Sequence, residues 1–352
     1  MCEIKFLEKI DKEQWDTYVK NHPFGWISHL THWKEAVEKS FKHIKGYFLI
    51  LIENGSIKAG LPIYFVKSLL TGKRLVSIPF ATLCDPLVNS QKEAEILFSE
   101  SIGIMKRLKA FQIEIRSFHA NYLNDGNFSK IEYYKHHYIN LEKRIEEIKK
   151  SFHRSCVRQR INRAEKSGIK IRVGQTEEDI KTFYHLYKIT RKRLFLPTIP
   201  FIFLKNLWLA FSSNQNIEIL LAEKDGKAIS GLLLFKFKDR VSAEAIGSDD
   251  NYNHLSPNHL LFWEAIHSAW AQGFKIFDFG RTSPENHTLM EFKNRWGTHI
   301  VDLPIYFYPG NKFSKSLIKE RKNTYKLTQK LCQITPLQAY EFLGKIIYSH
   351  LA

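Results

Sequence analysis

The 352-residue sequence has few cysteines and no long apolar run. Its four cysteines lie far apart and form no C-x-x-C pair, which argues against a disulfide framework and a structural zinc site. The N-terminal MCEIKFLEKIDKEQ alternates charged with single apolar residues, whereas a signal peptide needs an unbroken apolar core. No window approaches the roughly 18–20 apolar residues of a membrane span. We therefore expect a cytoplasmic protein without an integral membrane segment.

Several catalytic motifs are also missing. The 15 histidines include no H-E-x-x-H frame, no serine lies in a G-x-S-x-G elbow, and TGKR at 71–74 lacks the upstream glycine of a P-loop. Metal ligation and serine hydrolysis are therefore disfavoured. Positive charge, in contrast, is abundant: 53 Lys and Arg residues against 36 Asp and Glu residues give a net charge of +17. This excess favours polyanionic partners such as RNA, nucleotide-linked substrates or anionic lipid surfaces.

One pattern of elements occurs twice along the chain. Apolar runs surround Asn54-Gly55 in 47–68 and Asp225-Gly226 in 217–239, and both dipeptides predict β-hairpins. Each hairpin follows an aromatic-rich helical stretch and precedes a third strand, a helix, a strand ending in arginine and a final strand. These elements are expected at 26–41, 74–83, 91–109, 111–118 and 132–142, and again at 178–211, 240–248, 257–272, 274–281 and 299–309. The matched order predicts two homologous domains.

The expected domains are 1–145, 146–310, which carries the active site, and a basic helical tail at 311–352. Within the tail, residues 311–330 include seven basic residues and one acidic residue, together with an apolar side. We expect this tail to dock on the first domain. Attachment to an anionic membrane surface is the alternative.

The order of elements resembles the GNAT acyltransferase fold, which implies an α/β (α+β) class with tandem GNAT-like domains, each a mixed twisted sheet flanked by helices. Fold alone does not fix the donor or the acceptor. Acetyl-CoA-using members carry a Q/R-x-x-G-x-G/A turn that binds the pyrophosphate through backbone N–H groups. The two halves have ATLCDPLVNSQ and IGSDDNYNHLSPN at this place, so an ordinary acetyl-CoA enzyme is disfavoured.

The segment KKSFHRSCVRQRINRAEKSGIK, 149–170, joins the two halves and is strongly basic. Arg154 and Arg158 stack one helical turn apart, while Arg160 and Arg163 lie on another side. Such a helix can bind phosphates from more than one direction. A solvated linker helix is an equally weighted interpretation.

The segment FDFGRTSPENHTLMEFKNRWG, 277–297, follows a strand end, where open α/β sheets place ligands. Its final helix puts Phe292 and Trp296 on one apolar face, with Lys293 at the edge of that face. A purely structural interpretation has both aromatic rings in the core and the lysine extended to water. The equivalent place in the first half has no F-K-x-x-W-G run, which favours a specialised function for this one.

With these motifs the chain resembles the Fem family (FemAB-like) of peptidyltransferases, especially its compact exopolysaccharide- and exosortase-associated members. The resemblance rests on VRQRINRAEKSGIKI (157–171), FYHLYKITRKRLFLPTIPFIFLKNL (183–207) and the F-K-x-x-W-G run. It implies transfer of an amino acid from aminoacyl-tRNA to an amine of a peptidoglycan precursor, without a metal or bound organic cofactor. The coiled-coil arm of the tRNA-recruiting members is absent from this sequence.

The resemblance also implies residue roles. Lys293, beside Phe292, would stabilise the oxyanion that forms when an amine attacks an ester. The resemblance does not identify the general base, for which Asp278 and Glu285 are both candidates. The predicted substrate-binding residues are Arg154, Arg158, Arg160, Arg163, Arg193, Arg281, Asn286 and Trp296.

The leading functional hypothesis is an acyl or aminoacyl transferase that forms an amide on an amine of a phosphate-bearing cell-envelope precursor, of peptidoglycan or exopolysaccharide. It would work in the cytoplasm or at the inner face of the membrane. Two alternatives stay open: an N-acyltransferase that uses acyl-CoA, and a non-catalytic module that binds RNA or a lipid-linked glycan.

Overall fold

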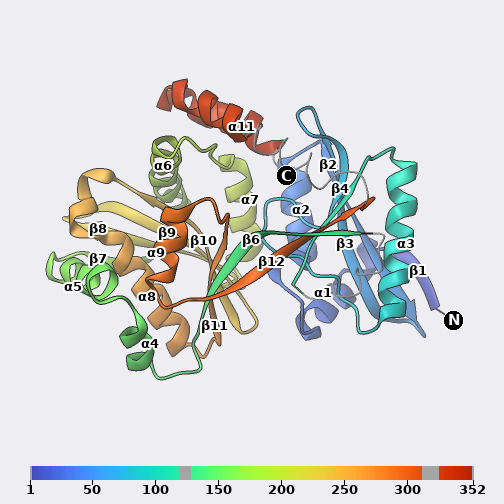
Figure 1. Ribbon diagram of the computed structural model, residues 1–352, viewed down its shortest axis with the longest axis horizontal. Helices are drawn as coiled ribbons and strands as arrows, with labels where there is room; N and C mark the ends of the chain where they lie inside the picture. Colours follow the sequence, from blue (N-terminus) through green and yellow to red (C-terminus); the bar gives the residue numbers. More distant parts are fainter. Residues whose placement is uncertain (1, 119–127, 311–324, 351–352) are drawn as a thin grey trace. The chain divides into compact units, whose positions relative to one another are not determined.

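The computed structural model describes residues 2–118, 128–310 and 325–350 (Figure 1). Internal contacts divide the chain into two compact units. Unit 1 comprises Met1–Tyr133, Asp302–Lys326 and Ile346–Ala352, and unit 2 comprises Tyr134–Val301 and Leu327–Lys345. Within the described ranges, no helix is both long enough and apolar enough to cross a membrane.

Unit 1 contains neighbouring strands in the order β1-β2-β3-β4-β5-β12, in which β4 and β5 are parallel. The hairpin expected around Asn54-Gly55 is present, and both residues have positive φ angles, 50° and 78°, as a type I′ turn requires. One sheet face packs against α3 in an apolar core. The elements are β1 (Cys2–Phe6), η1 (Lys9–Asp11), α1 (Lys12–Asn21), η2 (Ile27–His29), α2 (Thr31–Ser40), β2 (Ile44–Glu53), β3 (Ser56–Ser68), β4 (Gly72–Val76), α3 (Gln91–Arg107), β5 (Ile113–Arg116) and β12 (His299–Tyr308).

Unit 2 repeats this plan with the strand order β6-β11-β10-β9-β8-β7, in which β10 and β11 are parallel. One face of its sheet packs against α5 and α8, and α6 covers the other. A Cβ on Gly247 of β10 would lie 2.2 Å from the Tyr187 backbone nitrogen, so glycine permits this close approach of α6. The elements are β6 (Ser129–Asn140), α4 (Ile145–Ser151), η4 (Arg154–Arg158), α5 (Gln159–Lys166), β7 (Lys170–Gly174), α6 (Glu177–Arg193), α7 (Phe201–Phe211), β8 (Ile217–Lys224), β9 (Lys227–Phe237), β10 (Arg240–Ser248), η5 (Asp250–Leu255), α8 (Pro257–Ala271), β11 (Ile276–Thr282) and α9 (His287–Asn294).

The two halves of the sequence exchange their last strands. Residues 135–140 of β6, from the first half, pair with β11 of the second half. Residues 305–308 of β12, from the second half, pair with β5 of the first half. The boundaries expected from sequence, at 145 and 310, did not include this exchange. The hydrophobic pattern of a strand determines which of its faces is buried, but it does not determine which other strand it pairs with.

An arginine facing a buried carboxylate occurs at the same place in both units. In unit 1, Val76 is the register partner of Glu114, and Arg74 lies two residues before Val76. The Nη1 atom of Arg74 is 3.6 Å from Glu114 Oε2. Arg240 likewise lies two residues before the register partner of Asp278, and its Nη1 is 3.6 Å from Asp278 Oδ2. The equivalent positions support the duplication inferred from the order of elements.

The described part of the tail is divided between the two units. Residues 346–350 belong to unit 1, where the Tyr348 ring stacks on that of Phe80 with the ring centres 4.9 Å apart. Residues 325–334 are helical, and η6 (Leu337–Ala339) and α11 (Tyr340–Ser349) follow. Leu327–Lys345 belongs to unit 2, where the buried Tyr340 hydroxyl donates to the carbonyls of Arg191 and Leu196 at 3.2 and 2.7 Å. Residues 311–324, which carry most of the tail's basic side chains, lie outside the described residues.

Candidate active site

Lys293 is buried at the centre of the predicted site. It lies on α9, is 6% exposed, and its Nζ donates to the carbonyl oxygens of Gly280 and Arg281 at 3.0 and 3.1 Å. These carbonyls follow a bulge in β11 between Asp278 and Gly280. Gly280 has φ = 70°, a conformation that favours glycine. The surface interpretation of Lys293 is therefore wrong, because its ammonium is held inside the protein.

Burial changes the acidity of this lysine. Loss of hydration lowers the pKa of Lys293 to about 8, the carboxylates of Asp278 and Glu244 partly oppose this effect, and Arg281 adds to it. An ammonium group has three N–H donors, and two of them bind the backbone carbonyls. The third donor has no hydrogen-bond partner among the described residues.

Asp278 has polar side-chain partners at both of its carboxylate oxygens. Its Oδ1 accepts from the Gly280 N–H at 2.6 Å and lies 3.2 Å from His136 Nε2, while Arg240 faces its Oδ2. Burial raises the pKa of Asp278, but the partners, led by His136, outweigh it and leave the pKa lowered. A stabilised carboxylate is a weak base. The geometry therefore suits Asp278 to organising the site better than to accepting a proton.

The two halves differ at this ion pair. In unit 1, Arg116 donates from Nε to Glu114 Oε1 at 2.8 Å. In unit 2, His136 of β6 pairs with Asp278 instead. The arginine of the second strand, Arg281, lies beyond the bulge with its guanidinium 4.7 Å from the ring centre of Tyr134. The bulge thus lies at the place where unit 1 has its Arg116–Glu114 pair. In unit 2, the two backbone carbonyls that follow the bulge face Lys293.

Glu244 is a residue that the sequence analysis missed. It lies on β10 at a bulge between Ala243 and Ala245, and its Oε1 accepts from Ser242 Oγ at 2.6 Å. The residue is exposed to solvent, but protein atoms crowd its carboxyl. This loss of hydration, with a smaller contribution from Asp278, raises the pKa of Glu244 to about 7 against the opposing charges of Arg281 and Lys293. The only signal in the sequence is one acidic residue inside the apolar run VSAEAIG.

His137 is an uncharged side chain in the surroundings of Lys293. It is fully buried on β6, and its ring nitrogens contact Thr298 Oγ1 and Met290 Sδ, both at 3.3 Å. Burial and, secondly, the charge of Lys293 lower the pKa of His137 to about 4. The imidazole is therefore uncharged at neutral pH and places no second positive charge beside the ammonium.

The aromatic residues of the F-K-x-x-W-G run have different environments. Trp296 has no exposed surface, and its ring packs against Phe152 and His259 with centroid distances of 5.1 and 6.0 Å. It is a core residue in this structure and not the substrate contact predicted. Phe292 is only partly buried and immediately precedes Lys293 in the sequence of α9. Asn286 caps α9, because its Oδ1 accepts from the Leu289 N–H at 3.1 Å.

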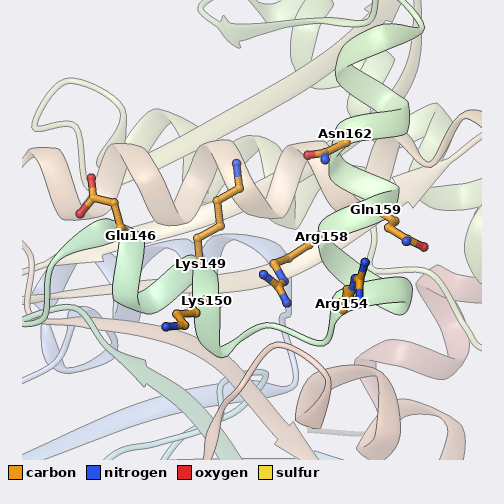
Figure 2. Close-up of a pocket in the computed structure, with 7 residues that line it drawn as sticks. All are labelled: Glu146, Lys149, Lys150, Arg154, Arg158, Gln159 and Asn162. Atoms are coloured by element: carbon orange, nitrogen blue, oxygen red, sulfur yellow. The ribbon is translucent and has the colours of Figure 1, made fainter.

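The basic segment forms a cavity of about 590 Å³ between α4, η4 and α5. Figure 2 shows Arg158 directed toward the lysines of α4. Arg158 Nε is buried and has no hydrogen-bond partner among the described residues. Four cations and one acid line this cavity, whose residues are Glu146, Lys149, Lys150, Arg154, Arg158, Gln159 and Asn162. Its charge and size suit a phosphorylated ligand.

The basic segment begins beside the end of α9. The His153 N–H donates to the Arg295 carbonyl at 2.8 Å, and η4 is a π-helical turn, a form often found at functional sites. Arg163 lines a second cavity of about 520 Å³ on α5. Arg160 and Arg193 line neither cavity: Arg160 lies near His259, and Arg193 pairs with Asp250.

Comparisons with known proteins agree with this architecture. Residues 151–294 match the family described as Acetyltransferase (GNAT) domain. The lipid II:glycine glycyltransferase of Staphylococcus epidermidis is 23% identical over 389 aligned residues, covering 83% of this chain and 90% of that protein. The crystal structure of FemX has a TM-score of 0.72 at 18% identity, covering 93% of this chain and all of FemX. A tandem GNAT protein from the clavulanic acid biosynthesis pathway has a TM-score of 0.55 at 8% identity, covering 89% of this chain and all of that protein.

The fold class and the family resemblance predicted from sequence are both confirmed by these matches. The solved structures share the mixed α/β fold with tandem GNAT-like sheets, and the curated relative spans most of the chain. Residues 151–294 thus match the acetyltransferase (GNAT) domain family, and over most of its length the chain is similar to lipid II:glycine glycyltransferases and shares the fold of FemX.

Proposed function

We propose that the protein forms an amide by moving an aminoacyl or acyl group onto an amine of a phosphate-bearing cell-envelope precursor. One observation carries the proposal: a buried ammonium, Lys293, is fixed by two backbone carbonyls and lies within electrostatic range of a carboxyl with a raised pKa, Glu244. The curated relatives, named lipid II:glycine glycyltransferases, support the class of acceptor.

The side chains of the site support direct transfer of the acyl group from the donor to the acceptor amine. The acceptor amine attacks the donor carbonyl carbon, a C–N bond forms, and negative charge develops on the carbonyl oxygen. The remaining N–H of Lys293 stabilises that charge in a site where little water competes. Glu244 accepts the proton of the attacking amine, since a base is most useful when its pKa is near the working pH. The ester C–O bond then breaks, and the proton passes to the departing oxygen.

Asp278, with its partners His136 and Arg240, is assigned the role of positioning the β11 bulge and the carbonyls that orient Lys293. Phe292, which precedes Lys293 on α9, packs against the aromatic core at Phe262 and Trp296. The active site lies in the second half of the chain, within 146–310, and is completed by β6.

Aminoacyl-tRNA is the proposed donor. The cationic cavity formed by Lys149, Lys150, Arg154 and Arg158 suits the phosphates of an RNA end. The acetyl-CoA type of glycine-rich turn is missing from both halves, which disfavours acyl-CoA. The proposed workplace is the cytoplasm, with peripheral contact at the inner membrane face, where lipid-linked envelope precursors are accessible.

Transfer assays with defined donors test this function. Purified protein would be given radiolabelled aminoacyl-tRNA, acetyl-CoA or longer acyl-CoA, each with peptidoglycan or exopolysaccharide precursors that carry a free amine. We expect amide product with aminoacyl-tRNA, and none with the Lys293→Met variant. Product only with acyl-CoA would identify an N-acyltransferase. Salt-sensitive binding of tRNA or lipid-linked glycan without product from any donor would identify a binding module and refute the proposal.

A further inference from the structure

The helical residues 325–334 turn an apolar stripe toward solvent. Leu327, Leu331 and Ile334 are 58%, 37% and 76% exposed. Their spacing of four and three residues places them on one side of the helix. The side that packs against unit 2 presents Thr328 and Cys332, which are 4% and 0% exposed. This inverts the usual arrangement, in which the apolar stripe of a surface helix faces the core.

Contacts within unit 2 hold this orientation. Lys192 Nζ donates to the carbonyl oxygens of Cys332 and Gln333, both at 2.9 Å. The Lys192 ammonium also lies 5.6 Å from the ring centre of Tyr340, which is itself hydrogen-bonded to α6. Rotating the stripe inward would break these bonds and expose Cys332. The exposed stripe is therefore part of the folded arrangement.

Positive charge accompanies the stripe. Lys326 and Lys330 are exposed and follow one edge of it, one helical turn apart. The sequence of 311–330 contains seven basic residues and one acidic residue. An apolar face bordered by lysines is the pattern of helices that lie in the plane of a membrane interface. Basic clusters of this kind are attracted to anionic headgroups.

We propose that the helix of residues 325–334 docks on the surface of an anionic lipid bilayer. Leu327, Leu331 and Ile334 enter the boundary between headgroups and acyl chains, and Lys326 and Lys330 contact the headgroups. The proposal rests on these residues and not on the chemistry at Lys293. It specifies a surface for the peripheral contact included in the proposed function, and it stands or fails separately from transfer.

Vesicle sedimentation tests the proposal. The full chain would be mixed with vesicles of phosphatidylcholine alone or with phosphatidylglycerol added. We expect binding to the anionic vesicles that is about tenfold weaker, or more, after the double change Leu331→Glu and Ile334→Glu. The double change Lys326→Glu and Lys330→Glu is expected to remove the preference for phosphatidylglycerol.

Leu209→Glu provides the matched control, because Leu209 is a 66% exposed apolar residue on α7 of the same unit. It should bind anionic vesicles as the wild type does. Thermal melts would confirm that each variant is folded, and transfer to a soluble acceptor would be measured in parallel. Wild-type binding by the Leu331/Ile334 variant would overturn the proposal. So would a dimer in light scattering that this variant dissociates, since a second copy would then cover the stripe.

Discussion

Lys293→Met would replace a buried ammonium with an apolar chain of similar length. The lowering of the Lys293 pKa from 10.5 to about 8 corresponds to about 3 kcal/mol of unfavourable free energy for holding the charged form at neutral pH. Methionine removes that cost but also removes two charge-assisted hydrogen bonds, each contributing about 1.5–3 kcal/mol. The two effects offset each other, so we expect a small change in unfolding free energy. The rate of acyl transfer, in contrast, should fall by about 10²–10³-fold.

The same substitution predicts a pH dependence of stability. The folded-state pKa of Lys293 lies below its ordinary value, so the cost of burial is complete below pH 8 and disappears above pH 10.5. The unfolding free energy of the wild type should therefore rise relative to that of Lys293→Met between these pH values. The expected rise is about 3 kcal/mol, measured by urea denaturation at a series of pH values.

Lys236→Met is the matched control for this experiment. Lys236 is also buried in unit 2, at 8% exposure, but its Nζ pairs with Glu218 at 2.7 Å. This control should lose stability and keep its transfer rate per folded molecule. If Lys293→Met kept the wild-type transfer rate, the role assigned to Lys293 would be wrong. If the unfolding free energies of Lys293→Met and the wild type changed in parallel from pH 8 to 10.5, the burial of Lys293 would be wrong.

Three further predictions concern the neighbouring groups. Glu244→Gln should lower the transfer rate by roughly 10²–10⁴-fold and abolish the loss of activity that the wild type shows as pH falls through about 7; an unchanged pH–rate profile would eliminate Glu244 as the base. Arg158→Ala should raise the KM for the donor about tenfold with kcat nearly unchanged, and Arg158→Lys should recover part of the loss; an equal fall in kcat would contradict a binding role. Asp278→Asn and its unit 1 counterpart Glu114→Gln should each destabilise the protein by about 3–5 kcal/mol, because each removes the charge of a buried carboxylate that faces an arginine; calorimetry showing no loss for either would refute the duplicated ion pair.

Much of the fold followed from local patterns. The hairpins at Asn54-Gly55 and Asp225-Gly226 were predictable because positive φ angles at these residues suit tight turns. The order of the remaining elements then indicated two related domains. The strand exchange between β6 and β12 was not predictable, since strand pairing depends on contacts between distant segments.

The candidate site was predictable to a smaller extent. Lys293 was identified because F-K-x-x-W-G is found in only one of the two halves and is shared with the Fem family. Trp296 was misassigned because the spacing of an apolar helix face does not tell a core from a binding surface. Glu244 was missed because its raised pKa depends on neighbours contributed by other elements.

The sequence by itself determined the duplicated order of elements, the basic segment at 149–166 and Lys293 as the leading catalytic candidate, because each depends on turn chemistry, charge or spacing within a short stretch. Only the tertiary structure decided that His136 of β6 pairs with Asp278 of β11, and that the bulge beside them presents two carbonyls to Lys293. The reason is physical: burial and the pairing of charges raise or lower pKa values, and both depend on which distant segments the fold brings together.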